Sequence, residues 1–183
     1  MKVLTHNFIT YLETLAEDRA ALAALRRGLG QRPGTAPEMY PYVVRLLPKE
    51  AYPNSWIEQS YYLIAALYAL HPQSTVTGNL GNHFANTLDP NPDLNAATER
   101  RFTALLTAHM DDLPFYLRHA ISFLKAKEQA INWHQLMWDV RDWGHPDRQN
   151  RVQKQWATQF WRRRNEDAAV TENVNAETQP TDD

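Results

Sequence analysis

The chain has 183 residues, 43% of them hydrophobic and 22% charged, with a formal net charge of −2 and no cysteine. This composition is typical of one globular domain, and it excludes a disordered chain, a disulfide framework, a thiolate zinc site and a cysteine nucleophile. The longest apolar run, residues 61–70, is about half of the roughly 20 residues that span a bilayer, and the N-terminus does not resemble a secretory signal, so we expect a cytoplasmic protein without membrane contact.

The N-terminal part of the chain predicts one long amphipathic helix followed by a connector rich in loops. Apolar residues recur every three or four positions from Phe8 to Leu29, and Gly30 marks the end of this pattern. The prolines within residues 31–54 allow at most one short helix, over residues 42–47, because proline interrupts helical hydrogen bonding.

Residues 55–70 predict a buried central helix. Ser55 and Glu58 form the sequence pattern of a capping box, in which a hydroxyl and a carboxylate satisfy backbone amides at the helix start. The apolar run that follows leaves no polar face, so other helices must surround this one. A turn and a shorter helix over residues 80–88 come next.

The C-terminal half predicts three periodic helices and a final one from near Pro146 to Arg164. Polar residues that can cap a helix precede the three: Asn95, Asp111 or Asp112, and Asn132. No useful segment alternates polar and apolar residues with a period of two. We therefore predict an all-α fold, a bundle of about six to eight helices, in one domain over residues 1–164.

Residues 165–183 form an acidic tail that we expect to be disordered, because they carry almost no hydrophobic side chains. The tail holds six Asp and Glu and no Lys or Arg, which leaves 19 basic against 15 acidic residues before it. The predicted domain is thus mildly basic. Its excess lies in residues 94–164, with 12 basic against 7 acidic residues, and favours an anionic partner.

Basic residues are placed away from the predicted apolar stripes. Arg118, Ser122 and Lys125 recur on one side of a helix, opposite its inward-facing leucines. Such a surface would contact phosphates without reading bases, with affinity that falls as salt rises. The alternative is a solvated face that binds nothing. The candidate nucleic-acid-binding residues are Arg26, Arg27, Arg100, Arg101, Arg118 and Lys125.

Tryptophan is concentrated near the C-terminus, with five of six within residues 133–161. Trp133 fits the apolar stripe of its helix, but Trp138 lies about 140° further round and must meet another helix, another subunit or a base. Trp143 is similarly displaced. We predict Trp138 and Trp143 as candidate subunit-interface residues, since aromatic residues are enriched at interfaces. Coverage of both rings by helices of the same domain is the alternative.

Motifs for catalysis or metal binding are missing from the sequence. The seven histidines form no H-E-x-x-H pattern and no pair four residues apart, and the phosphate-binding and nucleophile-elbow motifs are absent. The closest group is His109, Asp111, Asp112 and His119, whose aspartates stand where helix caps belong. We expect no enzymatic activity, metal or cofactor; a metal-dependent hydrolase using this group is the disfavoured alternative.

Four segments resemble the CasB-like small subunit of the type I-E Cascade complex of CRISPR defence. They are LAEDRAALAALRRGLG at 15–30, YYLIAALYALHP at 61–72, ERRFTALLTAHMDDLPFYLRHAISFLKAK at 99–127 and INWHQLMWDVRDWGHPDRQNRVQKQWATQFW at 131–161. Each alone is a common helical pattern. Their order and spacing together, over nearly the whole chain before the tail, make the resemblance distinctive.

The resemblance implies an all-helical, non-catalytic subunit. Two copies would lie along the crRNA-bound backbone subunits, contact the large subunit and stabilise the R-loop by holding target and non-target DNA strands, with no small-molecule substrate. The arginines in the segments LRRG, ERRF and LRH match basic positions of the family, and Lys125 and Lys127 extend the last of these. The acidic tail departs from the family pattern. A purely structural adaptor that makes only protein contacts is the alternative.

Overall fold

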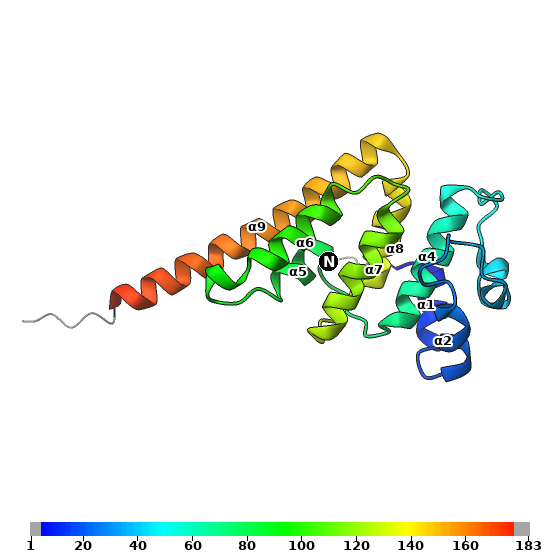
Figure 1. Cartoon of the computed structure of the whole chain (residues 1–183), viewed down its shortest axis with the longest axis horizontal. Coiled ribbons are helices and arrows are strands. Elements are labelled where there is room, and N and C mark those ends of the chain that lie inside the picture. The colour runs from blue at the N-terminus through cyan, green and yellow to red at the C-terminus, as the bar shows by residue number, and fades with distance from the viewer. Residues whose placement is uncertain (1–4, 178–183) are drawn as a thin grey trace, which may run out of the picture.

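The protein folds as a bundle of helices (Figure 1). The structure, a computed structural model, describes residues 5–177, with side chains for residues 5–162. Over this range the α-helices are α1 (Asn7–Thr14), α2 (Arg19–Arg26), α3 (Tyr40–Val43), α4 (Trp56–Leu70), α5 (Leu80–Ala85), α6 (Ala96–Leu106), α7 (Leu113–Ala126), α8 (Trp133–Trp143) and α9 (Pro146–Glu177). Short 3-10 helices are η1 (Pro37–Met39), η2 (Val44–Leu46) and η3 (Pro92–Leu94). The predicted all-α class is confirmed.

The number of α-helices in the described residues is nine, above the predicted range, partly because the expected first helix is two. The prediction of one continuous helix was wrong at Asp18, whose Oδ1 accepts hydrogen bonds from the amides of Ala20 and Ala21 at 3.0 Å each. An aspartate in this role begins a new helix. The chain turns between Thr14 and Arg19, so α1 and α2 pack separately.

Helix α4 is the buried centre of the bundle, as predicted. Every residue from Ser60 to Ala69 is buried, and α4 lies between α2 on one side and α7 and α8 on the other (Figure 1). The Ser55 hydroxyl accepts the Glu58 amide at 3.2 Å. The Glu58 carboxylate accepts the Asn54 amide at 2.6 Å rather than that of Ser55.

The other predicted caps differ in outcome. The Asn132 side chain accepts the Gln135 amide at 3.1 Å, which confirms its role as a cap. Asn95 and Asp112 stand at the N-cap positions of α6 and α7, but their side chains make no capping bond. The Asn95 amide group instead closes the preceding loop, because it bonds both the N–H and the carbonyl of Asp89.

Aromatic rings join the C-terminal helices to one another. Phe102 of α6 stacks on Phe160 of α9 with ring centroids 4.3 Å apart, and Phe84 of α5 contacts both Phe102 and Phe123. At Gly81 of α5 any Cβ would overlap the backbone carbonyl of Trp156. The absence of a side chain there lets α5 cross directly against α9.

Helix α9 is attached to α8 through a buried carboxylate. Asp139, 4% exposed, accepts hydrogen bonds from Trp156 Nε1 at 2.7 Å and from Gln135 Nε2 at 2.8 Å. Burial raises the pKa of Asp139 to about 6, although both hydrogen bonds oppose this shift by stabilising the carboxylate. Near neutral pH the Asp139 carboxylate is therefore mostly charged, although its buried surroundings disfavour the charge.

The last helix continues past Arg164 to Glu177, so the backbone is helical over the first part of the tail that we expected to be disordered. Residues 178–183 of that tail lie outside the described residues. Within residues 5–177, none of the helices has both the length and the apolar character needed to cross a membrane.

Substitution of Asp139 by Asn should change how stability depends on pH. The folded protein binds the Asp139 proton more tightly than the unfolded chain, because the pKa rises from 3.8 to about 6 on folding. Protonation of this group therefore stabilises the fold, and the gain grows as pH falls from about 6 towards 4. Denaturant titrations at a series of pH values should show this gain. As pH falls from about 6 towards 4, the free energy of unfolding of the wild type should increase relative to that of the Asp139→Asn variant. Parallel curves would contradict this assignment.

Candidate nucleic-acid interface

The outer side of α7 carries the predicted line of hydrogen-bond donors. Arg118, Ser122 and Lys125 are exposed. Opposite them, the apolar stripe of the same helix is completely buried: Leu113, Leu117, Ala120, Ile121 and Leu124. Burial of the stripe fixes the rotation of α7 about its axis, and this rotation holds the donors towards solvent.

The C-terminal end of α4 brings cations from α2 and α7 to the same place. Arg26 donates from Nε to the carbonyl of Ala69 at 2.9 Å. Burial lowers the pKa of His71, the bond to the Gln129 carbonyl opposes this, and the charge of Lys125 adds to the lowering. Arg26 thus lies at a helix end whose free carbonyls carry partial negative charge. The end of α7, which carries Lys125, meets the same region through the bond between His71 and Gln129.

Helix α6 contributes Arg100 and Arg101, both exposed. The Arg101 guanidinium lies over the ring of Phe123 on α7, 4.4 Å from its centroid. This contact places one α6 cation directly beside the α7 donor line. Arg27 and Lys127 are also exposed, at the ends of α2 and α7 respectively.

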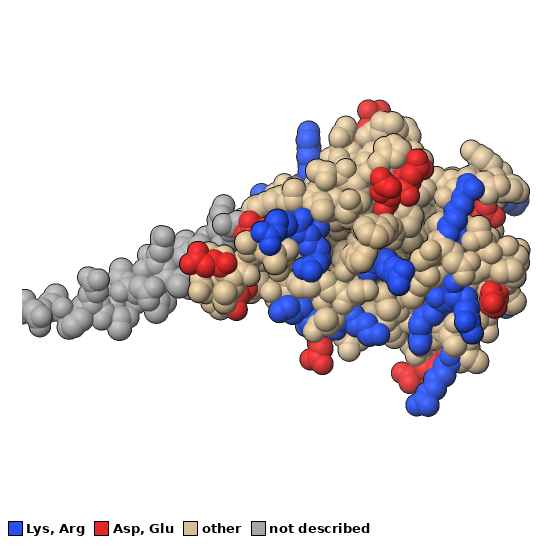
Figure 2. Space-filling model, in the orientation of Figure 1, with Lys and Arg blue, Asp and Glu red and all other residues tan. Residues whose placement is uncertain are grey.

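Among the residues with described side chains, these cations have no acidic partners. Across residues 5–162, none of the seven predicted basic side chains forms an ion pair with an Asp or Glu. Figure 2 shows Lys and Arg side chains spread over the middle and lower part of one face, from the α6 and α9 end to the α2 end, with acidic side chains mainly towards its margins. Uncompensated charge of one sign attracts a ligand of the opposite sign.

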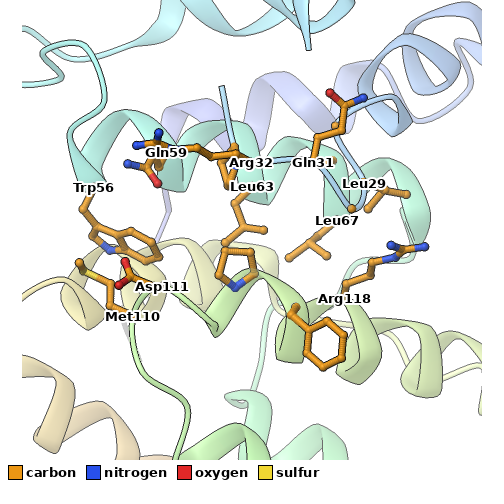
Figure 3. A pocket seen from close by; sticks show the side chains of 16 residues that line it. Leu29, Gln31, Arg32, Trp56, Gln59, Leu63, Leu67, Met110, Asp111 and Arg118 are labelled. Atoms are coloured by element: carbon orange, nitrogen blue, oxygen red, sulfur yellow. The ribbon is translucent and has the colours of Figure 1, made fainter. Parts of the chain in front are cut away.

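A groove of about 530 Å³ lies beside this cationic face, between α4, the start of α7 and the loop of residues 28–33. Arg118 stands at one end and Trp56 at the other, with Leu63 and Leu67 of α4 between them (Figure 3). Gly30 has φ +79°, and a Cβ there would lie 2.6 Å from Arg118 Nη1. Glycine therefore allows both the turn and the close approach of the guanidinium.

The sequence did not single out two residues of this groove, Arg32 and Phe115. Phe115 precedes Arg118 by three positions, and this spacing places both on one side of α7. The sequence spacing could therefore have indicated Phe115 as a candidate residue beside Arg118. Arg32 could not be placed from the sequence, because its position depends on how the loop folds over α4.

The two predicted interface tryptophans have different environments. Trp143 is 1% exposed, packs on Trp156 with ring centroids 5.2 Å apart and donates from Nε1 to the Ala108 carbonyl at 3.3 Å. Its prediction as a subunit contact is wrong, because α9 and the turn after α6 cover the ring.

Trp138 remains partly exposed. Arg141 lies over its ring, 5.1 Å from the centroid, and the His6 ring packs against it at 4.8 Å. Its indole N–H is buried without a hydrogen-bond partner among the described residues. The role of Trp138 as an interface residue stays a prediction.

No metal site is formed by the described residues: none of their His, Asp and Glu side chains gather in groups of three or more suited to an ion. His109 lies 3.4 Å from Asp111, both side chains being largely exposed. The ring of His119 packs edge-on against Phe115 instead, with centroids 4.4 Å apart.

The fold and this face define a class: an all-helical protein whose cationic surface has no acidic partners among the described side chains. Comparison with known proteins then gives the family, because the family model described as CRISPR-associated protein Cse2 matches residues 21–161. The chain belongs to the CRISPR-associated Cse2 family, which confirms the resemblance noted in the sequence.

Individual relatives agree with this membership. The chain is similar to the CRISPR-associated protein Cse2 of Thermus thermophilus, 34% identical over 160 residues that cover 84% of this chain and 88% of the relative. The crystal structure of CasB from Thermus thermophilus matches with a TM-score of 0.71 at 33% identity, covering 85% and 96% of the two chains. A chain of a CRISPR RNA-guided surveillance complex matches with a TM-score of 0.74 at 26% identity, covering 92% and 95%.

Two neighbouring arginines allow structural and ligand-binding roles to be separated. Arg26→Ala removes the hydrogen bond to Ala69 and should lower the free energy of unfolding by about 1 kcal/mol. Arg27→Ala, with the same change of charge and side chain, should lower it by less than about 0.5 kcal/mol, because the guanidinium of Arg27 makes no bond to the described residues. Chemical denaturation measures both. Equal losses would contradict an anchoring role for Arg26.

Proposed function

We propose that this chain is a non-catalytic subunit of a CRISPR RNA-guided surveillance complex of the Cascade type. The family membership and the likeness to a chain of such a complex support the proposal. By this proposal its protein partners are the backbone subunits, the large subunit and a second copy of itself.

Within that complex, the cationic face of α2, α6 and α7 would hold the phosphates of target or displaced DNA and so stabilise the R-loop. The observation that carries this proposal is the set of exposed cations on three helices that have no carboxylate partner within residues 5–162. Phosphate contacts give affinity without sequence preference. This suits a complex in which guide pairing, rather than protein, selects the sequence.

Charge reversal at two central positions tests this surface. The double variant Arg100→Glu/Arg118→Glu should weaken binding of single-stranded DNA by the purified chain and shorten the lifetime of the R-loop in the assembled complex. Two lost phosphate contacts should also reduce the slope of log affinity against log salt by roughly 1.5. Fluorescence anisotropy over a salt series measures both effects.

The matched control is Arg19→Glu/Lys49→Glu, which makes the same change of net charge at two exposed positions outside the predicted set. It should retain most of the salt slope. Equal loss in both double variants would mean that net charge alone matters, and unchanged binding and R-loop lifetime in Arg100→Glu/Arg118→Glu would refute the proposed surface.

A structural adaptor is the second candidate, and the partly exposed Trp138 with its stacked Arg141 favours it. Ultraviolet crosslinking of the assembled complex separates the two. Crosslinks from DNA to peptides within residues 97–127 would support the nucleic-acid surface, and crosslinks to other subunits alone would support the adaptor.

A further inference from the structure

The groove beside α4 and the cationic face have one residue in common. Arg118 belongs to the α7 donor line and also closes one end of the groove (Figure 3). A strand held along that line would therefore pass the mouth of the groove. The volume of about 530 Å³ falls in the range of small-molecule sites.

The groove offers an apolar surface and an exposed aromatic ring. Leu63, Ala66 and Leu67 of α4 form its floor and are themselves buried, whereas Trp56, Met110 and Pro114 are partly exposed along it. The rise from Trp56 to Leu67 along the helix gives the groove a length of about 16 Å. Phe115 is 60% exposed, with the ring of His119 packed edge-on against it at 4.4 Å between centroids, so much of the Phe115 ring faces solvent. It lies one helical turn from Arg118, the separation at which a ring and a cation can contact one nucleotide.

We propose that this groove binds an unstacked nucleotide of single-stranded nucleic acid, with Phe115 against the base and Arg118 on the phosphate. A positively charged track combined with an aromatic platform is the common design of sequence-tolerant single-strand binding. The inference rests on the proposed function, because a strand must first lie on α7.

Charge sets the direction of the nucleotide in the groove. Arg118 carries positive charge, and Figure 3 places it at the end of the groove opposite Trp56. Arg32 lies between the two ends, beside Gln59, and does not set the direction. Asp111 lies beside Trp56 at that other end and would repel a phosphate. The phosphate therefore belongs at the Arg118 end, and the base lies towards Phe115 and the partly exposed apolar side chains of the groove.

The test combines removal of the ring with removal of the bases. The purified full-length chain is titrated with a deoxythymidine oligomer and with an abasic oligomer of the same length. The wild type should bind the first at least about fivefold more tightly, since stacking on one aromatic ring contributes at least this factor. Phe115→Leu should lose this preference and leave the slope of log affinity against log salt unchanged, because no phosphate contact is removed.

The matched control is Tyr52→Leu, which removes an aromatic ring that is 69% exposed and lies outside the groove. It should preserve the preference for bases. Circular dichroism of Phe115→Leu should match the wild type, because the side chain it replaces is largely in solvent.

The outcomes distinguish the groove from the wider surface. If binding depends on salt but is the same with and without bases, and the same in Phe115→Leu, the nucleotide site in the groove is refuted and the proposed function still stands. If Phe115→Leu instead weakens assembly with other subunits while DNA binding persists unchanged, the groove takes a protein segment and the inference is overturned. An absence of any binding to either oligomer overturns both proposals.

Discussion

Complete burial of α4 is the constraint on which the rest of the molecule depends. A helix that is apolar on every side is stable in water only when other helices surround it. Helices α2, α7 and α8 do so directly, and each must turn its own apolar stripe inwards. Their polar sides are thereby fixed towards solvent, so packing around α4 determines where the cations of α2 and α7 lie.

The C-terminal end of α4 links this packing to electrostatics. Its last carbonyls are acceptors without helical partners, and one of them, on Ala69, accepts the Arg26 side chain. The end of α7, which carries Lys125, meets the same helix end through the hydrogen bond between His71 Nε2 and the Gln129 carbonyl. Helix dipole and hydrogen bonding offset part of the repulsion among these cations, which have no carboxylate partners in the described chain. A cluster of like charge can then persist on a small domain before any ligand neutralises it.

Sequence patterns predicted the features that depend on one helix at a time. The apolar stripe of α7 placed Arg118 and Lys125 outside, and the ten-residue apolar run identified α4 as central. Features that depend on two helices were missed or mistaken. Trp143 was displaced from its own stripe, yet α9 covers it. The groove could not be foreseen, because its walls come from a loop, α4 and α7, which are far apart in the chain.

Asp18 shows a different limit of prediction from sequence. The sequence contained the signal for a helix cap at Asp18, but the apolar periodicity around it outweighed that signal. Leucines on both sides of Asp18 keep a helical period, so periodicity alone favoured one helix, whereas the aspartate cap divides it. Division at Asp18 has a consequence for function. A short, separately oriented α2 can place Arg26 against the end of α4 and continue into the loop that forms one wall of the groove. A continuous helix could not turn at Asp18, so α1, which contacts α8, and α2, which packs on α4, would share one axis. The cap at Asp18 therefore allows α2 to take the orientation that places Arg26 at the end of α4.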